Sequence, residues 1–488
     1  MVAGGVEQGP EGAAHGDPEP RSSHGGGPPR GLSRLSRSSL DRGRYGRMFR
    51  HLPALDLDDA TLVALADSMG PYPTPADAAD TQADPVIQPG ENPDIPAGYT
   101  YLGQFVDHDI TYDPTSVLQR RNDPDALVDY RTPRFDLDSI YGSGPEDAPY
   151  LYDQTDQFKL LIGRNHNAHQ EREDLPRNSQ GRALLGDPRN DVHVIIAQLS
   201  LAVLRFHNAV VDHLRDRFVP DTELFAEAQR LTRWHYQWVV IEDYLRRTVG
   251  DEMLRRVLVD DPARGGRRAD LRWFTWKRRP FMPVEFSVAA FRFGHSQIRA
   301  TYVLNAGLAP KHIMVPFPTP DPQEHLGGFR PLPKGWTVDW SLFFAAGDSA
   351  PQLSRRIDTK VVGPLSRLPA VLDPDHRSLA LLDLLRARAL GLPSGEAVAA
   401  AMGTARHDLG LGGQTPLWYY LLREAEVDSG GLRLGPTGAR IVAEVLVGLL
   451  AGDPSSFLRV APGWTPELPS AVPGQFTMVD LLRFAGVA

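Results

Sequence analysis

The stretch DVHVIIAQLSLAVLRFHNAVVDHLRDRF, residues 191–218, decides the fold class of this chain. Its apolar side chains recur at steps of three and four residues, the spacing that gathers them on one face of an α-helix. The positions that follow this rule are Val192, Ile195, Ile196, Leu199, Val203, Phe206, Val210 and Leu214. The pattern predicts a long helix whose apolar face is buried in a core.

Helical spacing also covers residues 223–247, and it returns in four C-terminal segments. These segments are residues 378–390, 395–402, 416–426 and 438–451. The best strand-like runs are short and lie at 302–304 and 312–315. The 43 prolines and 45 glycines among 488 residues favour short helices joined by irregular loops. We therefore predict a mainly α fold, in a single large domain over residues 51–488 with little β structure.

Residues 1–50 have a different composition, rich in Gly, Pro, Ser and Arg. Such a segment cannot bury enough apolar surface to fold, so it is expected to be a disordered leader. It lacks the apolar stretch of a signal peptide, which favours a cytoplasmic location over export. Residues 441–451 form an apolar run of only about half the length of a membrane-spanning helix, and Glu444 interrupts it, so no membrane span is predicted.

Composition excludes several kinds of chemistry. The chain has no cysteine, which rules out disulfides, cysteine nucleophiles, iron–sulfur clusters and thiolate-ligated haem. Any metal must therefore be held by His, Asp, Glu or backbone oxygens. The formal net charge of −9 argues against nucleic acid as a partner, because binding phosphates requires a basic face.

Polar residues cluster in YTYLGQFVDHDIT, residues 99–111. On a helix, Gln104 and His108 are four residues apart and share a face, whereas Asp109 points about 100° away. One helical turn could therefore serve two sites on opposite sides. On this pattern alone, His108 could equally be a histidine packed in the core.

Oxygen ligands are closely spaced in the loop RTPRFDLDSIYG, residues 131–142. Thr132, Asp136 and Asp138 offer side-chain oxygens, and Asp109 could complete the set. Because Ca²⁺ binds about six to eight such oxygens, the loop is a candidate calcium site. The alternative is an Asx-rich turn without metal.

Two further residues stand at positions suited to a pocket. Arg189, in GDPRND at residues 186–191, precedes the long helix and could be a solvated charge or project into a site. His295, in FRFGHSQI at residues 291–298, lies among aromatic and apolar residues. A neutral imidazole there suits a metal ligand, but it also suits a packed core histidine.

In order and local sequence, these four segments resemble the animal-type haem peroxidases of the peroxidase–cyclooxygenase superfamily. A fifth similar segment is LDLLRARALGLP, residues 382–393. The resemblance extends over roughly residues 90–410 and is that of a bacterial-like member, similar to myeloperoxidase and lactoperoxidase at the haem site. It implies a helical haem-peroxidase fold that binds haem b and Ca²⁺.

The resemblance assigns the distal side of the haem to three residues. His108 would be the base that takes a proton from H2O2 and returns it to the departing oxygen. Arg189 would stabilise the negative charge that develops on that oxygen. Gln104 would lie at the distal water or halide position.

On the proximal side, the resemblance assigns His295 as the iron ligand. Arg292 and Arg386 would face the haem propionates. Asp383 aligns with the usual asparagine partner of the proximal histidine. A carboxylate there would increase imidazolate character and lower the reduction potential, which makes iodide, thiocyanate and phenols easier donors than chloride.

Covalent links to the haem are expected to be fewer than in mammalian members. Asp107 matches the aspartate that forms one ester in those proteins. Val192 stands where they carry the glutamate of the second ester, and His193 stands at the site of the sulfonium link. The haem is therefore expected to be ester-linked through Asp107 at most.

For calcium, the resemblance implies a set of ligands drawn from two segments. The set is Asp109, Thr132, Arg134 through its carbonyl, Asp136 and Asp138. Because the first of these directly follows the distal base, the ion would fix the distal helix.

The implied function is a peroxidase that reduces hydrogen peroxide while oxidising a halide, thiocyanate or small aromatic donor. One alternative is a fatty-acid dioxygenase of the same superfamily, but Arg292 stands where those enzymes carry a radical-forming tyrosine. Another is a catalytically inactive, calcium-stabilised binding protein of the same fold, which would not need His108, Arg189 and His295 together. The physiological donor and the oligomeric state stay open.

Overall fold

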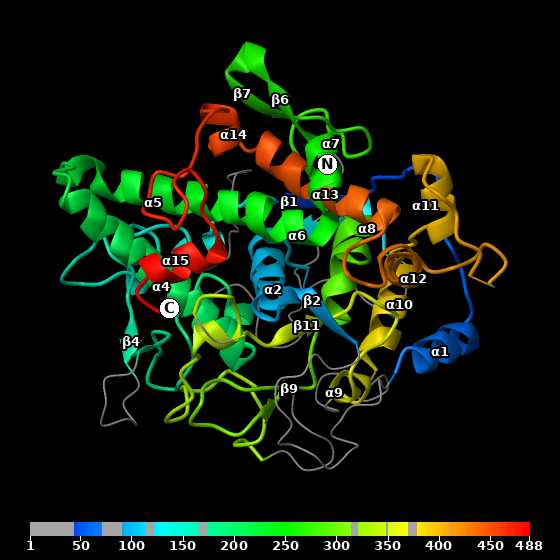
Figure 1. Cartoon of the computed structure of the whole chain (residues 1–488), viewed down its shortest axis with the longest axis horizontal. Coiled ribbons are helices and arrows are strands. Elements are labelled where there is room, and N and C mark those ends of the chain that lie inside the picture. The colour runs from blue at the N-terminus through cyan, green and yellow to red at the C-terminus, as the bar shows by residue number, and fades with distance from the viewer. Residues whose placement is uncertain are drawn as a thin grey trace, which may run out of the picture.

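The computed structural model describes residues 43–70, 90–113, 122–164, 173–313, 321–347, 350–368, 378–409 and 411–488 (Figure 1). The α-helices are α1 (Asp59–Ser68), α2 (Gly98–Ile110), α3 (Asp138–Tyr141), α4 (Val194–Arg215), α5 (Asp221–Trp238), α6 (Arg246–Val249), α7 (Asp251–Val257), α8 (Val284–Ser287), α9 (Gly363–Ser366), α10 (Leu379–Ala389), α11 (Gly395–Met402), α12 (Leu417–Ser429), α13 (Pro436–Gly452), α14 (Phe457–Val460) and α15 (Met478–Phe484). The strands are β1 (Gly43–Gly46), β2 (Glu91–Pro96), β3 (Val128–Asp129), β4 (Gly163–Arg164), β5 (Glu173–Asp174), β6 (Leu258–Asp261), β7 (Gly266–Ala269), β8 (Met282–Pro283), β9 (Thr301–Tyr302), β10 (Lys311–His312) and β11 (Leu353–Arg355). The prediction of a mainly α fold with little β structure is confirmed.

The strands form small sheets beside the helices. The largest sheet within the described ranges has three strands in the order β3-β1-β8, with β1 antiparallel to β3 and parallel to β8. The strand predicted at 302–304 is shorter than expected and corresponds to β9, which pairs antiparallel with β10. The last two residues of the other predicted strand, 314 and 315, lie outside the described residues.

The folded part of the chain begins before the boundary expected at residue 50. Residues 43–46 form β1, and Phe49 is buried. The backbone N–H groups of Met48 and Phe49 donate to the carboxylate of Glu285 at 2.9 and 3.0 Å. Composition could not predict this order, because the partners of the segment come from β3 and β8, far along the chain. The rest of the predicted leader, residues 1–42, lies outside the described residues.

Helix α4 is the long helix predicted from residues 191–218. His193 caps it by accepting from the backbone N–H of Ile196, and Phe218, at a φ of 57°, turns the chain after its last residues. Among the described helices, α4 alone has the length and hydropathy of a membrane span, and 83% of that stretch is buried inside the protein. Burial of this kind is typical of a core helix.

The segment predicted as one helix over 223–247 is interrupted by a π-helix. Helix α5 continues into the π-helical segment η4 (Val239–Leu245) and then into α6. The wider turn brings Tyr244 against α2, where a Cβ on Gly103 would lie 2.5 Å from the Tyr244 hydroxyl oxygen. Only a glycine allows this close approach. Periodicity did not predict the π-helix, although such segments often occur near functional sites.

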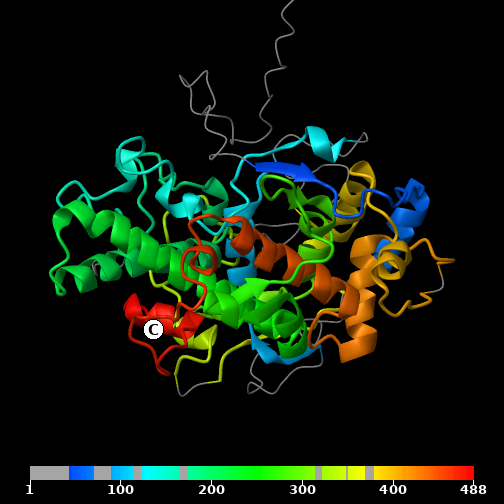
Figure 2. The same ribbon diagram turned by 90° about the horizontal axis from the view of Figure 1, so that it is seen from above.

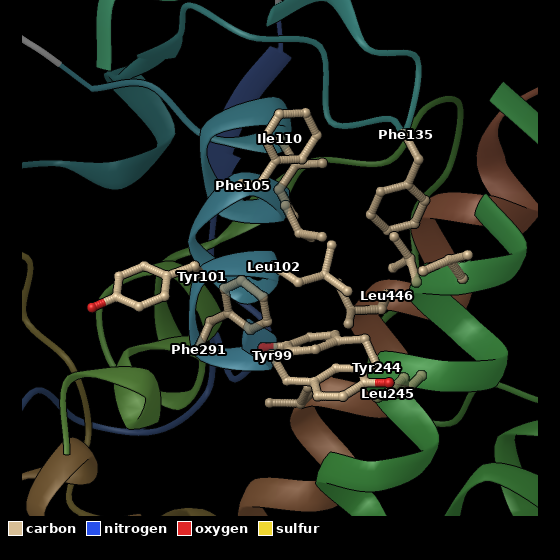
Figure 3. Packing of buried hydrophobic residues seen from close by; sticks show 14 of the residues in the cluster. Tyr99, Tyr101, Leu102, Phe105, Ile110, Phe135, Tyr244, Leu245, Phe291 and Leu446 are labelled. Atoms are coloured by element: carbon tan, nitrogen blue, oxygen red, sulfur yellow. The ribbon is translucent and has the colours of Figure 1, made fainter. Parts of the chain in front are cut away.

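Helix α2 lies near the centre of the molecule (Figure 1). Its apolar side chains meet η4 and α13, as Leu102, Tyr244 and Leu446 do in Figure 3. Gln104 and Asp107 are the two residues of α2 that are not buried. Two half-exposed polar residues on a central helix indicate that this face borders open space.

The C-terminal helices match their predicted ranges closely, as α10 to α13. In Figure 1 and Figure 2, α4 and α5 extend to one side of the molecule and α10 to α12 gather at the other. Helix α2 and the short 3-10 helix η6 (Ala290–His295) pack together between them. This contact brings residues 104–108 and 292–295 into one region.

Candidate functional site

His108 is held in one orientation by a buried asparagine. Its Nδ1 lies 2.8 Å from Oδ1 of Asn190, and both side chains are buried. Because a carbonyl oxygen only accepts, Nδ1 carries the proton and Nε2 keeps its lone pair. That is the tautomer a proton-accepting base requires.

Burial keeps this imidazole neutral. It lowers the pKa of His108 to about 4, with a further contribution from the nearby charge of Arg189. A neutral ring with a free Nε2 can accept a proton at physiological pH.

Arg189 is fixed beside His108 by an ion pair and two carbonyls. Its Nη2 donates to the carbonyls of His108 at 2.9 Å and Thr111 at 2.5 Å, and to Asp187 at 2.7 Å. The guanidinium also lies 4.6 Å from the ring centroid of Tyr112. The side chain is 25% exposed, so this fixed cation still borders the open region.

Asp187 organises this corner of the site. It accepts from the backbone N–H of Arg189 at 2.8 Å and from Nε of Arg131 at 2.9 Å. Burial opposes its ionisation, but the two arginines outweigh burial and lower the pKa of Asp187. Its role as the shared partner of two arginines depends on the fold, because Arg131 lies 56 residues earlier in the chain.

Gln104 shares the His108 face of α2, as predicted, and pairs with a histidine of α4. Its Oε1 lies 2.8 Å from Nε2 of His193. Asp107 is half-buried on the same helix and accepts from the hydroxyl of Thr111 at 3.0 Å. The structure therefore brings together the predicted set of Gln104, Asp107 and His108.

On the facing segment η6, His295 pairs with a buried carboxylate. Its Nδ1 lies 2.6 Å from Oδ2 of Asp383, a fully buried residue of α10. Although burial opposes ionisation, His295 and Arg292 lower the pKa of Asp383. Nδ1–H thus donates to a carboxylate, and Nε2 makes no hydrogen bond within the described part of the chain. An imidazole in this state suits a metal ligand.

Arg292 pairs with the same carboxylate as His295. It forms an ion pair through Nη1 with Asp383, and its Nε donates to the Ser287 carbonyl at 3.1 Å. The carboxylate of Asp383 is thus shared between Arg292 and His295. Sequence did not reveal this pair because its partners are 91 residues apart.

Arg386, the other arginine predicted to face a propionate, lies one turn after Asp383 on α10. It follows Asp383 by three residues on α10 and lies 3.7 Å from Asp113. Burial and the nearby charge of Arg292 lower the pKa of Arg386. A negative group between these two arginines would relieve their repulsion, which fits a carboxylate of a bound cofactor.

A separate cluster of carboxylates lies on the opposite side of α2. Oxygens of Asp109, Asp136 and Asp138 lie within 4.8 Å of one another. Burial and mutual repulsion raise the pKa of Asp109, and burial followed by the charge of Asp136 raises that of Asp138 to about 7. Within the described ranges, the buried Oδ1 of Asp138 has no hydrogen-bond partner. These oxygens could hold a metal ion, and Nη1 of Arg131 already lies 3.5 Å from Oδ2 of Asp138.

The other two predicted ligands also lie in this loop. The Thr132 hydroxyl donates to Asp136 at 2.7 Å, and the Arg134 N–H donates to the Thr132 carbonyl at 2.8 Å. Leu137 adopts a left-handed φ of 58°, and its N–H points to Asp109 at 3.3 Å. The loop is therefore folded around the cluster.

A sequence model described as animal haem peroxidase matches residues 113–407, more than half of the chain. The chain belongs to the animal haem peroxidase family. The matched range includes Arg189, His295 and Asp383, whereas His108 and Gln104 lie just before it.

Individual relatives of this family are distant. The chain is 25% identical over 228 residues to a dual oxidase of Drosophila melanogaster, 30% over 122 residues to heme peroxidase 2 of Caenorhabditis elegans, and 29% over 222 residues to a peroxidase-like protein of Margaritifera margaritifera. These matches cover 46%, 23% and 43% of this chain, and 14%, 16% and 26% of the relatives.

Solved structures show the same fold at low identity. Peroxidase A from Dictyostelium discoideum aligns with a TM-score of 0.58 and 13% identity, over 86% of this chain and 88% of that one. A fatty acid α-dioxygenase from Oryza sativa aligns with a TM-score of 0.52 and 17% identity, over 75% of this chain and 70% of that one. The peroxidase–cyclooxygenase fold expected from the sequence is thus confirmed.

Asn190 is the functional residue that sequence reasoning missed. It lies in the 3-10 turn η3 (Pro188–Asp191), and its side chain orients His108. A polar residue beside Arg189 was the available signal, but nothing local connects it to a helix 82 residues earlier.

Replacing Asn190 with alanine is expected to slow the reaction of the haem-loaded protein with H2O2 by about tenfold, the scale of one lost orienting hydrogen bond. The reason is that His108 loses the acceptor that fixes its tautomer. Stopped-flow absorbance would measure the rate. Asn208→Ala, which removes a comparable amide that binds the Leu160 backbone, serves as the control and should leave the rate unchanged. If Asn190→Ala and Asn208→Ala reacted with H2O2 at the same rate, the role of Asn190 in orienting His108 would be contradicted.

Proposed function

We propose that this chain is a haem peroxidase, which reduces hydrogen peroxide while oxidising a halide, thiocyanate or small aromatic donor. One observation carries the proposal: a neutral, oriented His108 on α2 and a carboxylate-bound His295 on η6 belong to two segments that pack together. Bound haem would supply the iron redox chemistry that these side chains lack.

The donor set fits a haem with one protein ligand. His295 would bind the iron through Nε2, the nitrogen that has no hydrogen bond in the described structure. Arg386 would pair with a propionate, because a bound carboxylate would offset the burial and the charge of Arg292 that lower the pKa of Arg386. The half-buried carboxylate of Asp107 faces the same region as Gln104 and would be the residue for an ester link.

His108 would move the proton. Its free Nε2 accepts a proton from bound H2O2, and the resulting imidazolium returns it to the departing oxygen, which leaves as water. Arg189 stabilises the negative charge that develops on that oxygen. Because Asp187 and two carbonyls fix this arginine, the stabilisation requires little rearrangement during the reaction.

Asp383 supports a preference among donors. A buried carboxylate that accepts from Nδ1–H makes His295 a stronger electron donor to iron, which lowers the reduction potential. A lower potential favours iodide, thiocyanate and phenols over chloride. Of the two alternatives, fatty-acid oxygenation has support only from fold relatives, and Arg292 occupies the position of the required tyrosine.

The test is a donor screen with the haem-reconstituted chain. We expect H2O2-dependent oxidation of iodide, thiocyanate and phenols, little oxidation of chloride, and no O2 uptake with palmitic acid. His295→Ala is the matched control and should lack all these activities. A wild-type chain that binds haem but oxidises none of the donors would contradict the proposal, and O2 uptake with the fatty acid would favour the dioxygenase.

We also propose that Asp109, Asp136 and Asp138 bind Ca²⁺, with Thr132 and the carbonyl of Arg134. Three facing carboxylates with a buried oxygen lacking a partner support this assignment. Because Asp109 follows His108 directly, the ion would hold the helix that carries the base.

Calcium is expected to raise the unfolding free energy by about 2.7 kcal/mol at a concentration one hundred times the Kd. Asp138→Asn should raise the unfolding free energy of the calcium-free protein, because it relieves repulsion among the carboxylates. The same change should remove most of the increase in unfolding free energy that calcium gives the wild type. Denaturant unfolding with Ca²⁺ and with EGTA measures both effects. Asp358→Asn, a buried carboxylate outside the cluster, should keep the calcium response. Identical unfolding of the wild type with Ca²⁺ and with EGTA would contradict the site.

A further inference from the structure

Helix α4 begins with a histidine that contacts the distal glutamine. His193 is buried, and its two ring nitrogens have different partners. The Ile196 N–H points at Nδ1 from 3.2 Å, and Oε1 of Gln104 lies 2.8 Å from Nε2. The imidazole therefore connects the first turn of α4 to the His108 face of α2.

These contacts determine which atom of the glutamine faces the ring. Because Nδ1 accepts from a backbone N–H, it is unprotonated, and a neutral ring must carry its proton on Nε2. A protonated Nε2 needs an acceptor, which only the carbonyl oxygen of the Gln104 amide provides. The NH2 group of Gln104 then points away from His193, and it makes no hydrogen bond within the described residues.

The ring is held so that this arrangement persists. The Tyr101 ring packs edge-on against it, with centroids 5.1 Å apart and planes at 68°. The backbone of His193 forms a bridge to Gly327, and the Val194 N–H donates to the Leu326 carbonyl at 2.8 Å. Burial also lowers the pKa of His193 to about 3, so the ring stays neutral across the pH range of ordinary assays.

We propose that His193 is a positioning residue that holds the Gln104 amide with its NH2 group toward the distal site, and so makes that site a hydrogen-bond donor to small anions. The proposal rests on the proposed haem function, because the anion would bind beside the haem. Its consequence is specific: the two N–H bonds of Gln104 would be available to donate to an anion bound in the site. A reversed amide would present an oxygen there and repel anions.

Fluoride binding to the ferric, haem-loaded protein tests this inference through a double-mutant cycle. His193→Asn is the informative variant, because an asparagine can still cap α4 but is too short to reach Gln104. We expect His193→Asn and Gln104→Leu each to raise the fluoride Kd about tenfold, the scale of one lost hydrogen bond to a charged group. We expect the double variant to match Gln104→Leu within about twofold, because both changes remove one interaction.

Two results would overturn the inference. One is a fluoride Kd in His193→Asn equal to that of the wild type. The other is an additive cycle, in which His193→Asn weakens fluoride binding by the same factor whether or not Gln104→Leu is also present. Additivity would mean that the effect of His193 is purely structural, because such an effect does not depend on Gln104. Thermal unfolding of all four proteins, followed by circular dichroism, reports the structural effect separately. A wild-type chain that binds no haem would overturn the proposed function itself, whereas normal haem binding with an additive cycle overturns the role of His193 alone.

Discussion

His108→Leu is expected to slow the reaction of the haem-loaded protein with H2O2 by about 10³-fold, within the range that a positioned general base contributes. The leucine fills a similar volume but cannot accept the peroxide proton. Arg189 and the proposed iron ligand stay in place, so peroxide should still bind while proton transfer fails. Stopped-flow absorbance at increasing peroxide concentration gives the second-order rate constant.

The expected loss should be specific to this histidine. His213→Leu changes a histidine of α4 that packs edge-on against Phe484, away from the distal face, and should leave the rate within about twofold. A His108→Leu protein that reacts as fast as the wild type would contradict the assignment of the base. A similar loss in His213→Leu would point to general damage to the fold.

Asp383→Ala is expected to have the second largest effect, because it removes the partner of both Arg292 and His295. Leaving a part-buried guanidinium without its carboxylate should cost about 3 kcal/mol of unfolding free energy, the lower end for a broken buried pair since the Arg292 side chain is 25% exposed. Denaturant unfolding of the apoprotein measures this cost. The variant should also bind haem more weakly, because His295 loses its orientation.

Asp383→Asn separates charge from shape at the same position. The amide oxygen can still accept from Nδ1–H of His295, but the amide carries no negative charge. The reduction potential of the haem-loaded protein should therefore rise. Spectroelectrochemistry measures this potential. An unchanged potential in Asp383→Asn would contradict the role of the carboxylate in setting donor preference.

Sequence predicted the elements whose cause is local. Apolar spacing over 191–218 and in the C-terminal segments corresponds to α4 and α10 to α13, because one-sided burial of a helix leaves a periodic pattern. The sequence pattern predicted neither that residues 43–50 are folded nor the π-helix η4. The first depends on pairing with distant strands, and the second on how Tyr244 meets Gly103.

For the site, the sequence likewise indicated which residues take part but not which contacts they make with one another. The motifs predicted His108, Arg189 and His295 as site residues. In the structure, Arg189 donates to the carbonyl of His108, and His295 lies on η6, which packs against α2, the helix of His108. Sequence did not show that Asn190 orients the base or that Asp383 holds Arg292. Both contacts join residues more than eighty positions apart, where no local pattern operates.

The assignment of His295 as the iron ligand of a haem peroxidase is tested by the absorbance spectrum of the purified, haem-reconstituted protein before and after one equivalent of H2O2, with His295→Ala measured alongside. We expect a Soret band that shifts with peroxide in the wild type and is weakened or lost in His295→Ala. A wild-type chain with no Soret band, or a His295→Ala protein with the same band and the same shift, would contradict this assignment.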